Sequence, residues 1–75
     1  MEYMVVIHPA EGRGYWAEIP ALPGCFTQAE TIEELLTRAP EAIESHVQAL
    51  REDGQAVPDE QLVIAVIRLR EPSAA

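Results

Sequence analysis

The fold of this chain is decided by residues 14–28, which read GYWAEIPALPGCFTQ. From Tyr15 to Ile19, apolar side chains at every second position alternate with Trp16 and Glu18. A period of two is typical of a β-strand, because successive side chains point to opposite faces. The stretch therefore predicts a strand with two chemically different faces.

Turns on either side place this strand in the middle of a meander. Pro23 and Gly24 predict a type II turn in which the glycine takes a positive φ, and residues 25–28 then form a short strand. Residues 3–7 are apolar and rich in β-branched side chains, and a loop containing two glycines follows them. The sequence thus predicts three antiparallel strands, each paired with the next.

A long amphipathic helix is expected next. Thr31 and Glu34 have the spacing of a capping box, and apolar residues recur at steps of three and four as far as Leu50. Gly54 is suited to the residue that ends a helix, which gives a length of about 22 residues. Pro40 interrupts the pattern without shifting it, so a bend is expected rather than a break.

Residues 62–67, LVIAVI, are continuously apolar, which is typical of a strand covered on both faces. We expect it to lie beside the first strand and parallel to it, after a helical crossover. The predicted fold class is α+β, with the element order β-β-β-α-β, strand order 3-2-1-4 and one long helix on one face. Residues 1–70 would form a single domain, with residues 71–75 as a disordered tail.

One helix can cover only one face of such a sheet. Apolar side chains of the fourth strand on the opposite face would have nothing in one copy to bury them. A homo-oligomer is the expected remedy, and its interface would include Val63, Ala65 and Ile67.

Charge and composition limit the choice of partners. The 75 residues carry 13 acids and 5 bases, a net charge of −8, which repels phosphate backbones and anionic lipids. We expect no direct contact with nucleic acid or membrane; a basic protein partner suits the charge, as does solubility alone. A single cysteine permits no internal disulfide, so the expected location is the cytoplasm.

Residues that could carry chemistry are few. His8, His46 and Cys25 do not have the spacing of a metal site or a catalytic pair, and we interpret them as structural. A nuclease with two metal ions needs several acids on the strands, whereas Glu18 is alone on the second strand. We therefore predict no catalytic residue, no metal, no cofactor and no enzymatic activity.

Several motifs together resemble the HicB antitoxin family, specifically its N-terminal domain. They are residues 14–28, then TIEEL at 31–35, APEAI at 39–43 and GQAVP at 54–58. The resemblance extends over roughly residues 3–67. It implies a partial RNase H-like fold that binds and silences a HicA toxin, a small basic ribonuclease that cleaves mRNA. It also implies a homodimer or homotetramer.

The end of the chain departs from the family pattern. Many HicB proteins carry a second, DNA-binding domain, and the five residues after Arg70 are too few for one. We expect this chain alone not to repress a promoter. An alternative is an orphan homo-oligomeric module that binds an unknown protein or a small ligand; a small basic protein encoded by the neighbouring reading frame would favour the antitoxin.

The predicted partner-binding surface is the exposed side of the hairpin together with the turn after it, because recognition residues often lie on loops of a rigid scaffold. Its residues are Tyr15, Trp16, Pro23, Gly24, Cys25 and Thr27. The acidic outer face of the helix, which includes Glu41, Glu44 and Glu52, is an alternative surface for steering a basic partner.

Overall fold

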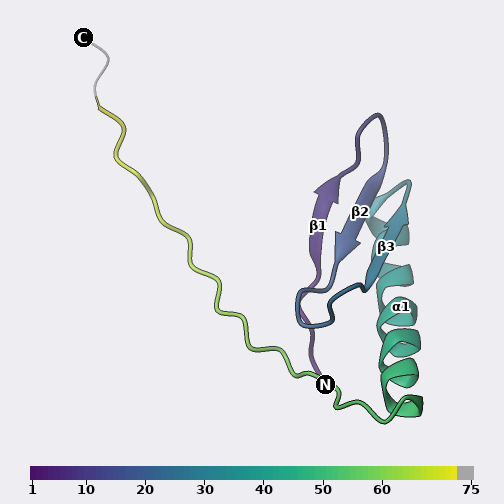
Figure 1. Ribbon diagram of the computed structural model, residues 1–75. Helices are drawn as coiled ribbons and strands as arrows, with labels where there is room; N and C mark the ends of the chain where they lie inside the picture. The colour runs from purple at the N-terminus through teal and green to yellow at the C-terminus, as the bar shows by residue number, and fades with distance from the viewer. Residues whose placement is uncertain (73–75) are drawn as a thin grey trace.

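Three antiparallel strands form one sheet in the computed structural model, which describes residues 1–72. They are β1 (Val6–Pro9), β2 (Tyr15–Glu18) and β3 (Phe26–Ala29), in the order β1-β2-β3 (Figure 1). A tight loop joins β1 to β2, and its Gly14 has φ +83°. A Cβ at Gly14 would come within 2.8 Å of the Ala29 carbonyl oxygen, so this close approach of two strands requires glycine.

The turn between β2 and β3 forms as predicted. The Cys25 amide donates to the Leu22 carbonyl at 3.0 Å, with Pro23 and Gly24 between them and Gly24 at φ +86°. Proline presets the first central residue, and glycine accepts the positive φ of the second. This turn directs the chain into β3.

The helix α1 (Ile32–Glu52) has 21 residues and begins at the predicted cap. The Thr31 hydroxyl accepts a hydrogen bond from the Glu34 amide at 3.1 Å. The Glu34 carboxylate pairs with Arg38 at 2.6 Å, so the cap is made by the threonine. The helix continues through Pro40, as predicted, and Gly54 follows its end with φ +72°.

The core lies between the helix and one face of the sheet. Within residues 1–72, α1 packs against β3 and β2 but not against β1, and Figure 1 shows the helix on the β3 side. The buried side chains are Ala17, Ile19, Leu22, Cys25, Leu35, Ala39 and Val47. One side of the sheet is thus covered and the other is free of any helix.

The predicted fourth strand is not part of this sheet. The α+β class, the three antiparallel strands and the long helix are confirmed, but residues 62–70 carry no strand pairing and every one of them is exposed. We call residues 61–70 the arm, and Figure 1 shows it leaving the body on the β1 side. The radius of gyration is 16.3 Å, against about 11 Å for a compact chain of this length.

The predicted strand order 3-2-1-4 is therefore wrong for this chain. An apolar pattern favours an extended segment, but it does not determine the sheet edge with which that segment pairs. Val63, Ala65 and Ile67 therefore lie on the arm and not on the free face of the sheet. Glu71 and Pro72 have no secondary structure, and the rest of the predicted tail, 73–75, lies outside the described residues. No helix within residues 1–72 combines the length and the apolar character needed to cross a membrane.

Candidate functional site on the aromatic face of the sheet

The face of the sheet without a helix is built by residues that lie opposite one another on adjacent strands. His8 pairs with Trp16 across β1 and β2, and Glu18 pairs with Phe26 across β2 and β3. Side chains of cross-strand pairs point to the same face. Since the neighbouring Ala17 is buried under the helix, these four residues point the other way. We call them the aromatic face.

Three rings form a continuous row on this face. The imidazole of His8 and the indole of Trp16 are stacked, with centroids 4.3 Å apart and planes inclined by 17°. The ring of Phe26 lies 6.1 Å from that of Trp16 and is tilted by 50°. Both geometries lie in the range of attractive ring contacts. Phe26 is 58% exposed. Burying this large apolar ring against a partner would therefore be favourable.

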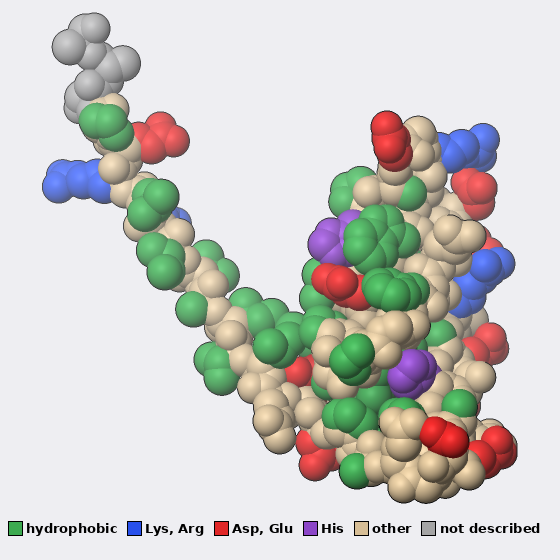
Figure 2. Space-filling model, in the orientation of Figure 1, with side chains coloured by type: hydrophobic (Ala, Val, Ile, Leu, Met, Phe, Trp, Pro, Cys, Tyr) green, Lys and Arg blue, Asp and Glu red, His purple; other side chains and the backbone are tan. Residues whose placement is uncertain are grey.

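An acidic group completes the row. The Glu18 Oε1 oxygen lies 3.3 Å from the His8 Nε2 nitrogen, and both side chains remain partly open to water. This contact restrains the imidazole ring that stacks on Trp16. Figure 2 shows this side of the sheet, where histidine, hydrophobic and acidic side chains lie next to one another. The rigid rings and the carboxylate together form an amphipathic surface with a defined shape.

Of the predicted partner-binding residues, Trp16 lies on the aromatic face and the others do not. Pro23 and Gly24 are exposed in the turn that leads into β3. Tyr15 and Thr27 have the strand parity of the buried Ala17, and both are half-buried on the helix side.

Cys25 lies furthest from a binding role, because it is 4% exposed within the core. Its Sγ donates towards the Ala42 carbonyl oxygen at 3.6 Å, and burial raises the pKa of its thiol above the ordinary value. A protonated, buried thiol is a poor nucleophile.

Sequence reasoning missed His8 and Phe26 as members of the site. The signal that could have found them is the register of the hairpin, because a loop closed between Ala10 and Gly14 places His8 opposite Trp16. The same counting across the second turn places Phe26 opposite Glu18.

The chemistry of the aromatic face suits binding more than catalysis. A histidine beside a carboxylate can move protons, but Cys25 lies on the other side of the sheet. Residues 1–72 hold no group of three or more histidine, cysteine or acidic side chains that could bind a metal ion. Exposed aromatic side chains on a rigid sheet are typical anchors of protein interfaces.

Comparison with known proteins agrees with a binding module. A family model described as the HicB-like antitoxin of bacterial toxin-antitoxin systems matches residues 3–72. The crystal structure of the N-terminal domain of the Burkholderia pseudomallei antitoxin HicB superposes with a TM-score of 0.65 at 30% identity, covering 88% of this chain and 74% of that one. The chain belongs to the HicB-like antitoxin family.

Two known proteins are similar to this chain over most of its length. A UPF0150 protein of Thermoplasma acidophilum is 40% identical over 58 residues, which is 77% of this chain and 84% of that protein. Antitoxin HicB 1 of Photorhabdus laumondii is 34% identical over 58 residues, and the match spans 77% of this chain and 37% of that antitoxin. Family membership supports an antitoxin role and implies a toxin as partner. Antitoxins of this kind are generally not enzymes.

Proposed function

We propose that this chain neutralises a HicA-like, mRNA-cleaving ribonuclease by binding it directly through the aromatic face. The observation that carries the proposal is the stacked pair of His8 and Trp16 beside an exposed Phe26. Large rigid rings at the centre of a patch commonly supply most of the binding energy of an interface. A surface of this kind can cover the catalytic groups of a small enzyme.

Charge supports the same partner. A ribonuclease binds the RNA phosphates with basic side chains. The net charge of −8 on this chain attracts such a basic protein. Glu18 places one carboxylate within the aromatic row, where it could accept hydrogen bonds from an arginine of the toxin. Attraction between opposite charges would mainly raise the rate of association, and the rings would slow dissociation.

The proposal includes the assembly and location of the chain. Residues 1–70 would act as one HicB-like domain with a partial RNase H-like sheet, forming a homodimer or homotetramer in the cytoplasm. Pro23 and Gly24 would lie at the rim of the interface, next to Phe26. Tyr15, Thr27 and Cys25 would support the sheet from the helix side.

The test uses co-expression with the small basic protein encoded in the neighbouring reading frame. Wild-type chain should restore growth and block RNA cleavage by that protein, and W16A/F26A should lower the affinity at least about 100-fold. The matched control is I32A/L36A, which removes exposed apolar side chains from the helix instead. That variant should inhibit like the wild type.

Two results would contradict the proposal. In one, the W16A/F26A variant folds and still inhibits the ribonuclease with wild-type affinity. In the other, the protein that co-purifies from the native host is not a nuclease, which would favour the orphan module.

A further inference from the structure

We propose that the arm of one copy adds as a fourth strand to the outer edge of β1 in a second copy, and that the second copy returns its own arm. The exchange rests on the homo-oligomer in the proposed function and is independent of what the toxin is. Each sheet would then have the strand order 3-2-1-4, with the fourth strand supplied by the other chain.

The arm has the composition of a buried strand but lies in the open. Val63 and Val66 are 92% and 94% exposed, and Ile64, Ile67 and Leu69 are also exposed. Six of the ten large hydrophobic side chains exposed in residues 1–72 lie between residues 62 and 69. A segment of this kind, rich in β-branched residues, pairs readily with a free sheet edge.

The outer edge of β1 can receive such a strand. The Ala10 amide donates to the Gly14 carbonyl, and pairing alternates along an antiparallel ladder, so His8 and Val6 bond to β2 while Ile7 faces outward. Within residues 1–72 no strand pairs with the outer side of Ile7, so its backbone N–H and C=O can bond to a further strand. Pro9 also faces outward, where its missing N–H removes no bond to β2.

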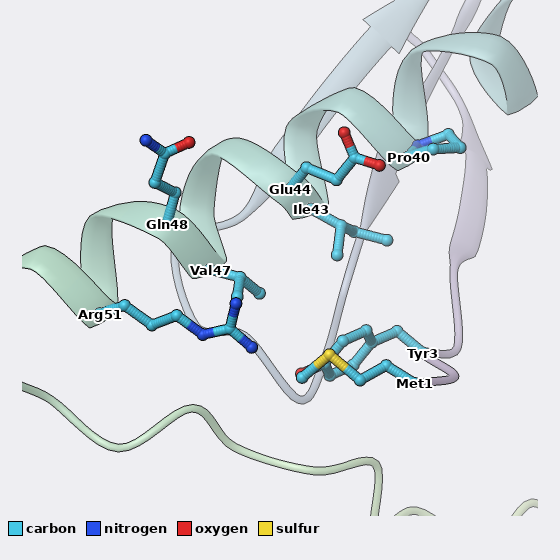
Figure 3. A pocket seen from close by; sticks show the side chains of 8 residues that line it. All are labelled: Met1, Tyr3, Pro40, Ile43, Glu44, Val47, Gln48 and Arg51. Carbon is cyan, nitrogen blue, oxygen red and sulfur yellow. The ribbon is translucent and has the colours of Figure 1, made fainter.

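A groove beside the start of β1 can receive side chains of the incoming strand. It has a volume of about 530 Å³, and one wall is formed by the helix, with Pro40, Ile43 and Val47 beside the polar Glu44, Gln48 and Arg51. Tyr3 and Met1 form the opposite wall, and Figure 3 shows Ile43 and Val47 pointing towards them. Since α1 does not pack on β1, an added strand could cover this groove and the partly exposed Ile43.

The base of the arm is held so that the arm projects outward. The Tyr3 hydroxyl donates to the Pro58 carbonyl at 2.6 Å, which fixes the connection beside the start of β1. The Glu60 carboxylate accepts from the Met4 amide at 2.8 Å and from the Leu62 amide at 3.0 Å. These bonds fix the base of the arm, yet within residues 1–72 the arm beyond it pairs with no strand of its own chain and is exposed throughout. The geometry therefore points to a second copy as the recipient.

Co-expression of two singly labelled chains tests the exchange. Both chains carry C25A, which removes the natural thiol; one adds V6C on β1 and the other adds a cysteine at one position of residues 63–67. Mild oxidation should produce a heterodimeric disulfide at one or two arm positions, because a disulfide forms only when the Cα atoms lie within about 7 Å. The position that reacts also gives the register.

Three results would overturn the exchange. One is a double variant with both cysteines in one chain that closes only an intramolecular disulfide. Another is cross-linking between two arm cysteines with none to V6C, which would place arm against arm. The third is sedimentation of the unmodified protein at micromolar concentration as a monomer of 8.3 kDa.

A charge on the arm provides an independent measurement. I64D should raise the dimer dissociation constant at least about 100-fold, because an unpaired carboxylate would be buried in the added strand. T37D adds the same charge to an exposed helix position and should leave the dimer intact. An unchanged dimer of I64D would contradict the exchange. Inhibition of the toxin is measured in a separate experiment. If W16A/F26A no longer inhibits the toxin but still forms the dimer, the result bears on the aromatic face and leaves the strand exchange unaffected.

Discussion

The indole ring of Trp16 lies on the imidazole ring of His8, with 4.3 Å between the two centroids and an angle of 17° between the planes. The two residues are direct partners across β1 and β2. The stack keeps the indole at a fixed position on the open face of the sheet, which lowers the entropic cost of using it as a binding anchor.

We expect His8 to stabilise the fold mainly by stacking on Trp16, and less by its contact with Glu18. We expect H8A to lower the free energy of unfolding by about 1 kcal/mol and H8F to retain most of it, because a second ring restores the contact with the indole. H8Q keeps a hydrogen-bonding group without a ring and should resemble H8A. Urea unfolding checks the order of the three variants, and H8Q as stable as wild type would contradict it.

The Thr31 cap should be worth a measurable part of the stability of this small domain. T31A removes the acceptor for the Glu34 amide and should cost about 1 kcal/mol, or a fall in Tm of about 4–8 °C. T37A is the matched control, since the Thr37 hydroxyl bonds to the Glu33 carbonyl in the exposed first half of the helix and should matter little. Thermal unfolding followed by circular dichroism measures both; equal losses would exclude a specific capping effect.

The buried thiol of Cys25 should make stability depend on alkaline pH. Burial raises the pKa of this thiol above its ordinary value of 9.0, so the folded state holds the proton more tightly than the unfolded state does. The resulting stabilisation is complete below the unfolded pKa and is lost as the pH rises through the folded pKa. Wild type should therefore lose stability above pH 9 faster than C25A, in which the other titrating groups are unchanged. Parallel curves for the two proteins would contradict this.

Protonation of Glu60 should be visible in the two backbone amides that donate hydrogen bonds to it. Hydrogen bonds from the Met4 and Leu62 amides lower the pKa of this carboxyl below its ordinary value of 4.5. At a pH above 4.5 the ionised carboxylate accepts both bonds and stabilises the base of the arm. This stabilisation is lost as the pH falls through the lowered pKa of the folded state, because the carboxylate is then protonated. The amide resonances of Met4 and Leu62 should shift together, with a midpoint below 4.5, and E60A should abolish the shift. A midpoint at or above the ordinary value would show that the bonds do not form in solution.

Local signals in the sequence predicted the parts of the fold that depend on local geometry. Pro23 and Gly24 form the predicted turn, and Thr31 caps the predicted helix, because each acts on atoms within four residues of itself. The apolar run at 62–67 predicted a strand that is absent from the sheet within residues 1–72, because such a run does not encode the edge with which it would pair. The position of the base of the arm depends on a long-range bond, from the Met4 amide to the Glu60 carboxylate 56 residues away.

The candidate site was predicted only in part for a similar reason. Trp16 is recognisable from its type and its place in an alternating strand. His8 and Phe26 become its neighbours only through the register of two separate turns, and a shift of one residue would move each to the other face. Cys25 was included in the binding surface because it belongs to the turn, but the turn directs its side chain into the core, which agrees with the structural role also predicted for it.

Trp16 is the single tryptophan of the chain, so labelling with 5-fluorotryptophan places one reporter on the aromatic face. On addition of the cognate ribonuclease, its one ¹⁹F resonance should shift and lose its accessibility to a soluble paramagnetic agent, at the same ratio of proteins at which RNA cleavage stops. Complete inhibition of the ribonuclease with an unshifted and equally accessible resonance would contradict binding through this face.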